Sequence, residues 1–395
     1  MAKKKIGIIV QRYGSDINGG AEYHARLIAE KIAPYFDIEV FTSTAHDYIT
    51  WEHHYPEGKE IINGIPVHRF KVAKPRDPKV FGDLQNFIFN EEHNIADELT
   101  WLEEEGPYVP GLLAALEQRE KEFAYFIFFS YRYYHSYWGL LKFKRKAILV
   151  PTAEHDEVIY LRLFKHLFHL PGAIVYNSHE EKEIINRVSG NEEVPGDIVG
   201  VGSEVPVVFS PQTFRERFDI QGKYFVYIGR LDENKGVPLL LEYYLKMLKE
   251  TDVDLTLVLM GKSVIEIPVH PRIKALGFMG NEEKFNGLKG AEFLVIPSQF
   301  ESLSMVALEA WAIGKPVAAN GRTEVLRGQC RRSNAGLWYT DYDEFKEIIL
   351  LLAENDRLKE IMGKNGRVFF ETHYSWPVIE NKYLKLIERL DALIL

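Results

Sequence analysis

The chain has 395 residues, more than one hydrophobic core usually fills, and we therefore expect two domains. With 46% hydrophobic and 27% charged residues, it is not a largely disordered chain. Its formal net charge of −9 creates no overall field that attracts nucleic acid, so any phosphorylated ligand must be held by a few local cations.

Neither a secretion signal nor a membrane helix is predicted. The apolar run that follows the basic N-terminus, Ile6–Val10, has only the length of a strand. The aromatic stretch Phe123–Leu141 is interrupted by serine, arginine and histidine. The single cysteine, Cys330, cannot form an internal disulfide, and we expect an inert thiol. The expected location is the cytoplasm. Peripheral contact of the basic run Lys142–Lys146 with the inner face of the membrane is the alternative to a solvated face.

Short β-rich segments alternate with helical patterns along most of the chain. In chain order, strands are predicted at Lys5–Val10, Ile38–Ser43, Val67–Phe70, Tyr125–Phe129, Ala147–Val150, Ala173–Asn177, Tyr224–Ile228, Leu255–Met260, Phe293–Ile296 and Val317–Ala319. Helices are predicted at Ala21–Ala33, Pro238–Lys249, Ser304–Ile313 and Trp376–Leu395. Strand–helix alternation of this kind implies parallel sheets that helices cover on both faces.

A cluster of glycines and prolines between residues 190 and 222 marks a boundary, and the alternation restarts after it. We therefore predict an α/β protein with two doubly wound, Rossmann-like lobes. The first lobe spans residues 1–198, the second spans 199–372, and a terminal helical segment spans 373–395.

The first candidate site follows the predicted strand Tyr224–Ile228. Arg230 comes at the carboxyl end of this strand, and Lys235 lies in the loop before the next helix. Open α/β sheets bind ligands at the carboxyl ends of their strands. Two cations there can hold a diphosphate, arginine as a planar fork and lysine as a point charge. The alternative is a pair of solvated loop cations.

The second candidate site lies in Pro297–Pro316, where a strand ends and a helix begins near Ser304. Glu301 comes just before this helix, and Glu309 lies within it. Carboxylates accept hydrogen bonds from sugar hydroxyls, and the start of a helix offers free N–H groups to phosphate. The alternative is that Glu301 helps to cap the helix and that Glu309 is a solvated helix residue.

Together, the two sites resemble the nucleotide-sugar site of glycosyltransferase family 4. The matching residues are Gly229-Arg230-x4-Lys235-Gly236, then Pro-Ser-x2-Glu301-x7-Glu309 with Gly314-Lys-Pro-Val. Members of this family are retaining enzymes with the GT-B fold, in which two Rossmann-like lobes face a central cleft. The resemblance covers nearly the whole chain. It includes the glycine loop Asn18-Gly19-Gly20-Ala21-Glu22, the segment Pro151-Thr-Ala-Glu-His155-Asp156, and Ser375-Trp376, which opens a terminal helix that crosses back to the first lobe.

The resemblance implies a role for each matching residue. The lobe at 1–198 would take the acceptor, and the lobe at 199–372 would take the nucleotide sugar. Arg230 and Lys235 would neutralise the departing nucleoside diphosphate, and Glu309 would accept hydrogen bonds from the ribose hydroxyls. Glu301 would hold hydroxyls of the donor sugar, and His155 would lie near its reacting face and bond its 6-hydroxyl. Backbone groups would complete the donor site at Gly19, Gly20, Ser302, Leu303 and Ser304.

The sequence departs from the family pattern at two places. After Glu301 most members have a glycine-containing turn, whereas this chain has Ser-Leu-Ser, which puts the choice of sugar in doubt. At the junction between the lobes, Val199-Gly-Val-Gly202 stands where most members carry Pro-Asn-Gly.

Other functional interpretations are disfavoured. Gly261-Lys262-Ser263 lacks the upstream glycine of a P-loop, and the first glycine loop lacks the dinucleotide fingerprint of an NAD-dependent oxidoreductase. His166 and His169 have no third ligand nearby in the sequence. Asp252-Val-Asp254 has the spacing of a metal-binding pair but precedes a strand, at the wrong end of the sheet. No metal site and no cofactor are therefore expected.

The resulting prediction is a retaining hexosyltransferase. Its donor would be a nucleoside-diphosphate sugar, with UDP-glucose as the first choice. Its acceptor would be a saccharide, free or lipid-linked, in the synthesis of a bacterial surface polysaccharide or exopolysaccharide. The alternatives are a nucleotide-sugar epimerase of the same fold and a non-catalytic nucleotide-sugar-binding module.

Overall fold

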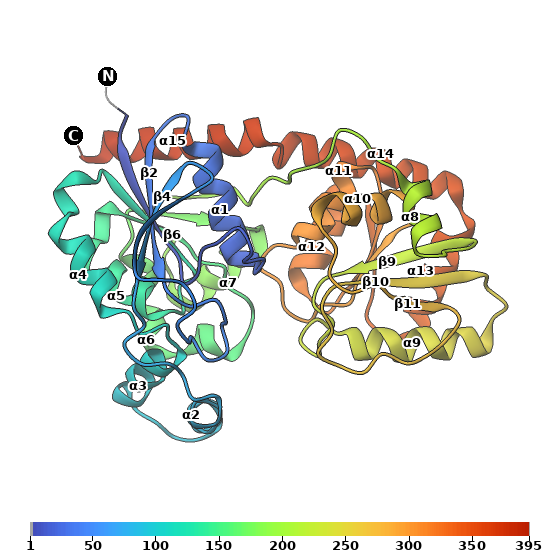
Figure 1. Ribbon diagram of the computed structural model, residues 1–395, viewed down its shortest axis with the longest axis horizontal. Coiled ribbons are helices and arrows are strands. Elements are labelled where there is room, and N and C mark those ends of the chain that lie inside the picture. Colours follow the sequence, from blue (N-terminus) through green and yellow to red (C-terminus); the bar gives the residue numbers. More distant parts are fainter. Residues whose placement is uncertain (1–2, 395) are drawn as a thin grey trace. The chain divides into compact units, whose positions relative to one another are not determined.

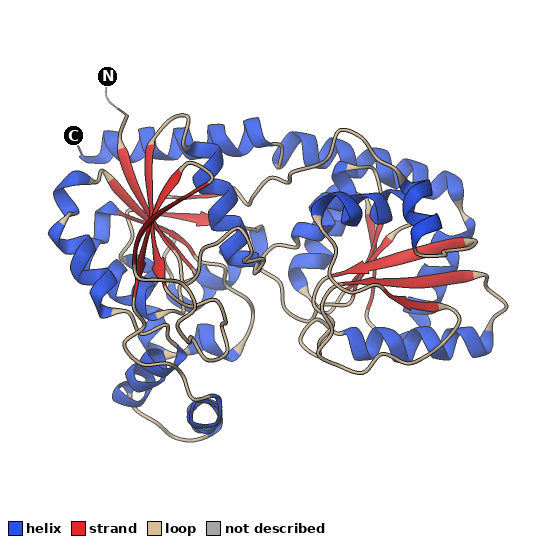
Figure 2. Ribbon diagram, in the orientation of Figure 1, coloured by secondary structure: helices blue, strands red, loops and turns tan. Residues whose placement is uncertain are grey.

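The computed structural model describes residues 3–394, and they form two compact units. The first unit runs to Val201 and includes the C-terminal segment from Ile379 onward, and the second unit is Gly202–Val378. The predicted boundaries were 198/199 and 372/373. In both units a single layer of strands is flanked by helices (Figure 2).

The described residues of the first unit form an eight-stranded sheet in the order β3-β4-β2-β1-β5-β6-β7-β8. All neighbouring strands are parallel except β3 and β4, which are antiparallel. The strands are β1 (Lys5–Ile9), β2 (Asp37–Ser43), β3 (Gly58–Ile62), β4 (Ile65–Phe70), β5 (Tyr125–Phe129), β6 (Ala147–Val150), β7 (Ala173–Tyr176) and β8 (Gly196–Ile198). The central strands are fully buried because helices cover both faces.

Seven α-helices of the first unit connect these strands (Figure 1). They are α1 (Gly20–Ile32), α2 (Pro78–Asn90), α3 (Ile95–Glu105), α4 (Pro110–Gln118), α5 (Tyr134–Phe143), α6 (Arg162–Lys165) and α7 (His179–Ser189). The core between helices and sheet is rich in aromatic residues, with Trp51, Trp101, Phe126 and Phe128 all essentially inaccessible to solvent.

The second unit has a six-stranded sheet in the order β11-β10-β9-β12-β13-β14, in which all pairs are parallel. Its strands are β9 (Lys223–Ile228), β10 (Leu255–Met260), β11 (Ile273–Ala275), β12 (Leu294–Ile296), β13 (Val317–Asn320) and β14 (Gly336–Tyr339). Its helices are α8 (Pro211–Arg217), α9 (Val237–Glu250), α10 (Asn281–Gly290), α11 (Met305–Ala312), α12 (Glu324–Ser333), α13 (Tyr342–Glu354) and α14 (Asp356–His373).

The C-terminal helix α15 (Trp376–Ile394) docks on the first unit, as the predicted crossing helix requires (Figure 1). Its apolar face is buried at Ile379, Tyr383, Ile387 and Leu390. Polar contacts fix its position along the sheet: the Glu380 carboxylate accepts a 2.9 Å hydrogen bond from Tyr35, Asp391 accepts a 3.0 Å bond from Tyr125, and Lys382 donates to the Ile198 carbonyl at 3.0 Å. The last predicted residue, Leu395, lies outside the described residues.

Strands β3, β8, β11 and β14 were not predicted. β3 pairs with β4 through a hairpin at Asn63-Gly64, where both residues have positive φ (48° and 82°). This dipeptide between two short strands is a turn signal that the alternation pattern alone does not use. β8 and β11 have only three residues each, too few for a pattern of alternation.

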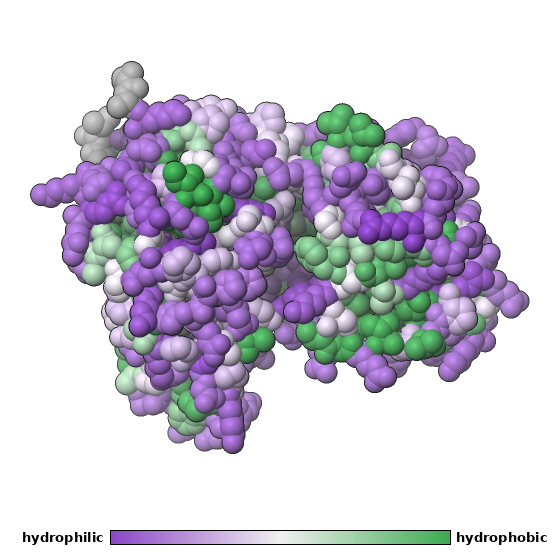
Figure 3. All heavy atoms as spheres, in the orientation of Figure 1, coloured by the Kyte–Doolittle hydropathy of each residue, from purple (hydrophilic) through white to green (hydrophobic). Residues whose placement is uncertain are grey.

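The surface view in Figure 3 shows patches of hydrophobic residues separated by hydrophilic ones. In the part of the chain that the structure describes, no helix is long and apolar enough to cross a membrane.

Two buried histidines of the first unit, His24 and His135, have a pKa lowered to about 3 by burial, which makes the stability of this unit sensitive to acid. His24 of α1 is almost inaccessible to solvent, and its ring packs edge-on against Phe129, with ring centres 5.2 Å apart. Burial lowers the pKa of His24 to about 3, and a hydrogen bond with the Gly200 backbone opposes this shift. The unfolded chain protonates His24 at pH values below its ordinary pKa of 6.5, whereas the folded state resists protonation until about pH 3. The fold therefore keeps its full stability above pH 6.5 and loses it progressively as the pH falls from 6.5 toward 3.

We therefore predict that replacing His24 with glutamine makes the protein less sensitive to acid. Between pH 7.5 and 4.5, the free energy of unfolding should fall by about 2–3 kcal/mol less in His24→Gln than in the wild type. Urea unfolding at the two pH values measures this difference. The exposed His54 supplies the control, because His54→Gln should lose as much stability as the wild type. Equal losses in His24→Gln and the wild type would contradict the prediction.

Candidate functional site

The first candidate site lies in the loop between β9 and α9. Gly229 follows the last residue of the strand, and the hydroxyl of Tyr227 donates a 2.6 Å hydrogen bond to the carbonyl of Arg230. The Arg230 guanidinium is about half exposed and forms an ion pair with Asp232, with 3.1 Å between Nη2 and Oδ2. Asp232 also accepts a 2.8 Å hydrogen bond from the backbone N–H of Lys235. Asp232, which was not among the predicted residues, therefore contacts the Arg230 guanidinium and the backbone of Lys235.

A second ion pair joins this loop to the one between β12 and α11. The Lys235 ammonium lies 2.9 Å from Oε1 of Glu301. β9 and β12 are parallel neighbours in the sheet, so their carboxyl ends, and the loops that follow them, lie on the same edge. The structure thus brings together three of the predicted site residues, Arg230, Lys235 and Glu301.

The backbone beside this ion pair requires a glycine. Gly236 has a φ of 69°, and a Cβ at this position would lie 2.2 Å from the carbonyl oxygen of Pro297. The glycine therefore lets the start of α9 approach the loop that carries Glu301. Further hydrogen bonds hold that loop: Asn320 donates to the carbonyls of Pro297 and Ser298 at 3.2 and 3.3 Å, and the Thr323 hydroxyl donates to Ser298 at 2.6 Å.

The start of α11 is not capped by a side chain. Ser304 occupies the N-cap position, but its hydroxyl makes no cap hydrogen bond and is buried without a partner. The backbone of Ser302, Leu303 and Ser304 leads into this helix start, and the first N–H groups of a helix have no partner within the helix. A helix start of this kind favours an anion electrostatically.

Glu309 is buried, and its interpretation as a solvated helix residue is wrong. Only 4% of its side chain is exposed. Oε1 accepts a hydrogen bond from Lys284 of α10, whereas Oε2 is buried and has no partner. Lys284 is the second residue of the site that was not predicted from the sequence. It and Glu309 lie on different helices, so no spacing in the sequence indicates their contact.

The other predicted residues belong to the first unit. Gly19 precedes α1 with ordinary extended backbone, and a Cβ there would lie 2.2 Å from the Glu22 carboxylate. Glu22 in turn pairs with Arg12 at 2.5 Å. A side chain at position 19 would therefore displace the Glu22 carboxylate from its place beside Gly19. A Cβ on Gly20 would meet nothing within 4 Å.

His155 is exposed and its Nε2 lies 2.8 Å from the hydroxyl of Tyr160. The neighbouring Asp156 pairs with Arg132 at 3.1 Å, and Arg132 pairs with Glu105 at 2.8 Å. Burial raises the pKa of Asp156, and the charge of Arg132 opposes the shift. This row of charges fixes the segment that carries His155.

The loop that leads to His155 is held by a buried carboxylic acid. Glu181 accepts a hydrogen bond from the backbone N–H of Ala153 at 2.6 Å, and both the backbone and the side chain of Asn177 donate to it. Burial raises the pKa of Glu181 to about 8, against the effect of these N–H donors. Upstream, Ser130 and Thr152 both have positive φ, and their hydroxyls are 2.7 Å apart. Strained backbone of this kind often marks functional sites.

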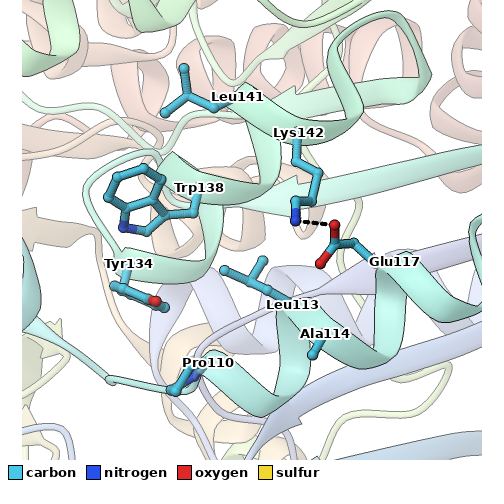
Figure 4. A pocket seen from close by; sticks show the side chains of 8 residues that line it. All are labelled: Pro110, Leu113, Ala114, Glu117, Tyr134, Trp138, Leu141 and Lys142. Carbon is cyan, nitrogen blue, oxygen red and sulfur yellow. Dashed lines mark ion pairs between the residues drawn. The ribbon is translucent and has the colours of Figure 1, made fainter.

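A pocket of about 430 Å³ lies elsewhere on the first unit, between α4 and α5 (Figure 4). Leu113, Tyr134 and Trp138 line it, and an ion pair between Glu117 and Lys142 borders it. None of the predicted site residues lines this pocket. In the basic run, Lys142 and Lys146 thus have acidic partners, Glu117 and Glu120.

No group of three or more His, Cys, Asp or Glu side chains among residues 3–394 is arranged to hold a metal ion.

Comparison with known proteins finds a family resemblance within the second unit. Residues 210–369 match the family of group 1 glycosyl transferases. An uncharacterized glycosyltransferase of Methanocaldococcus jannaschii is 28% identical over 179 residues, which are 42% of this chain and 48% of that protein. The chain spans about half the length of the curated relatives it matches.

Solved structures match the whole fold. Sucrose-phosphate synthase from Thermosynechococcus elongatus superposes with a TM-score of 0.73 at 18% identity, covering 99% of this chain and 100% of that one. The Anabaena protein HepE, in complex with UDP and glucose, gives a TM-score of 0.70 at 15% identity and covers 98% and 100%. The segment 210–369, less than half of the chain, thus resembles group 1 glycosyl transferases. The predicted GT-B fold is confirmed.

The close approach at Gly236 gives a prediction about the stability of the protein. Gly236→Ala should destabilise the protein strongly, because the new Cβ would overlap the Pro297 carbonyl in addition to straining the backbone. Gly277 is a matched control, since its φ is 74° and no atom lies within 4 Å of a Cβ built on it. Gly277→Ala should cost only the strain of a left-handed residue, about 1–2 kcal/mol.

Gly236→Ala should cost a further 1–3 kcal/mol, roughly the penalty of overpacking. Free energies of unfolding from urea titration measure both variants. If the two alanine variants were equally stable, the contact between Gly236 and Pro297 would not be the constraint that we infer.

Proposed function

We propose that this protein is a glycosyltransferase that moves a hexose from a nucleoside-diphosphate sugar to a saccharide acceptor, with retention of the anomeric configuration. The observation that carries the proposal is the meeting of Arg230, Lys235 and Glu301 at one edge of the second unit's sheet. These residues fall within the segment that matches group 1 glycosyl transferases. UDP-glucose is the proposed donor, supported by the fold shared with HepE, which binds UDP and glucose. The proposed acceptor is a bacterial surface saccharide or exopolysaccharide, free or lipid-linked.

The ion pair between Lys235 and Glu301 suits a donor that has a diphosphate and a sugar. Each member of the pair has a natural partner on such a molecule: the ammonium attracts the diphosphate, and the carboxylate accepts hydrogen bonds from sugar hydroxyls. The donor would therefore replace one internal ion pair with two contacts of its own. Arg230, half exposed beside Asp232, would add a second cation.

In the transfer step, the bond between the anomeric carbon and the diphosphate breaks, and negative charge grows on the diphosphate. A bond forms between the anomeric carbon and an acceptor hydroxyl oxygen, and the hydroxyl proton passes to the departing diphosphate. Arg230, Lys235 and the uncapped start of α11 would stabilise this charge as it develops. Glu309 would hold the ribose, and His155 would bond the 6-hydroxyl of the sugar. Gly19 and Gly20 would contribute backbone groups near the donor or the acceptor.

The first experiment measures turnover of UDP-, GDP- and ADP-glucose by the wild type and by Arg230→Ala and Lys235→Ala. We expect each variant to remain folded and to lose a factor on the order of 10²–10³ in turnover of the preferred donor, the effect of removing one such charge-stabilising donor. Lys249→Ala is the control, because it removes one exposed cation at the far end of α9 and should behave as the wild type. Near-normal turnover in both site variants would show that Arg230 and Lys235 do not stabilise the departing diphosphate.

The same assay separates the alternatives. An epimerase would convert the donor sugar without an acceptor, which product analysis of reactions with donor alone would reveal. A non-catalytic binding module would bind nucleotide sugars and raise its melting temperature with them, yet release no nucleoside diphosphate.

We further propose that transfer needs neither a divalent metal nor a cofactor. Arg230, Lys235 and the start of α11 supply positive potential at the place where a metal would otherwise meet the diphosphate. Treatment with EDTA should therefore leave most of the turnover with the true donor. Loss of activity in EDTA that returned on adding Mg²⁺ or Mn²⁺ would contradict this assignment; the same titration with a second acceptor shows whether the ion serves the acceptor instead.

A further inference from the structure

An ion pair between two helices of the second unit places a cation directly on Glu309. Lys284 of α10 donates a hydrogen bond from Nζ to Oε1 of Glu309 on α11. Only 16% of the lysine side chain and 4% of the glutamate side chain are exposed. An ion pair removed from water in this way is weak evidence for stability, because the loss of hydration offsets much of the attraction. Its presence is better explained by a function of the carboxylate.

The two oxygens of Glu309 have different surroundings. Oε1 is occupied by Lys284, whereas Oε2 is out of contact with solvent and has no hydrogen-bond partner. Buried polar atoms are rarely left without a partner, because a buried acceptor that makes no hydrogen bond has lost its hydration without compensation. A hydroxyl group that donated to Oε2 would remove this cost.

We propose that Lys284 is a positioning residue of the nucleotide site. It holds Oε1 of Glu309 and leaves Oε2 as the oxygen that accepts a hydrogen bond from one ribose hydroxyl. The inference rests on the proposed function, in which Glu309 binds the ribose. It adds that the carboxylate holds a single hydroxyl, so the two ribose hydroxyls contribute unequally to affinity.

The test is calorimetry of UDP, GDP and ADP, each compared with its 2′-deoxy and 3′-deoxy form. With the wild type, one deoxy form should bind about tenfold more weakly than the parent nucleotide, and the other should bind nearly as well as the parent. This comparison needs no variant. Equal losses for the two deoxy forms would overturn the assignment of one oxygen.

Variants of Lys284 test the positioning role. Lys284→Met should weaken binding of the parent nucleotide by about tenfold or more and should abolish the difference between the two deoxy forms, because Glu309 loses its fixed orientation. Lys284→Arg keeps the charge and should restore part of the nucleotide affinity and part of the difference between the two deoxy forms. A merely structural role would change stability and leave the ratio between the deoxy forms as it is in the wild type.

Lys359→Met is the matched control, since Lys359 pairs with Glu292 at a similarly buried place in the same unit and should not affect nucleotide binding. The inference would be overturned if Lys284→Met bound the nucleotide as tightly as the wild type and kept the same ratio between the two deoxy forms. It would also be overturned if this variant bound the nucleotide more tightly. If Glu309→Ala lost binding while Lys284→Met kept it, only the inference would fail. If the wild type bound none of the three nucleotides, the proposed function would fail together with the inference.

Discussion

The arrangement of the second unit's site depends on the ion pair between Lys235 and Glu301. It joins the loops that follow β9 and β12, and it forms only because Gly236 allows α9 to start against the carbonyl of Pro297. Asp232 extends the connection to Arg230, so a single chain of contacts fixes both cations and one carboxylate. Because the Lys235 ammonium and the Glu301 carboxylate are each other's partners, both charges are held in place before any ligand binds.

The principal strands could be predicted from the sequence because they are buried on both faces and therefore read as apolar runs. Tyr125–Phe129 and Leu255–Met260 begin and end as predicted. The strands that were missed are short or lie at a sheet edge, where polar residues obscure the pattern. β3 is exposed along most of its length, and β11 has three residues. Such strands form because a neighbouring strand offers hydrogen-bonding groups, a condition that no local pattern records.

Part of the candidate site could likewise be predicted from the sequence, and part of it could not. Residues that follow strands could be placed together in advance, since the carboxyl ends of parallel strands share an edge, and this rule brought Arg230, Lys235 and Glu301 together. Contacts made through space between helices could not be predicted, and Lys284 on Glu309 is the main example. The contact of Asp232 could have been predicted, because an aspartate three residues before Lys235 has the spacing at which a side chain accepts a hydrogen bond from a backbone N–H.

Several polar atoms without partners lie in loops or helices that follow strands, where open α/β sheets bind ligands. In the first unit these include Oε1 of Gln11, Oδ1 of Asp156 and Oδ1 of Asn177, and in the second unit they include Oγ of Ser304 and Oε2 of Glu309. Each costs stability, by about 1–3 kcal/mol where burial is complete. The apolar strands beneath them supply stability and contain few polar side chains. Apart from the Ser304 hydroxyl, these atoms only accept hydrogen bonds. Within each unit, a bound group that donates a hydrogen bond to one of them would therefore recover part of this cost.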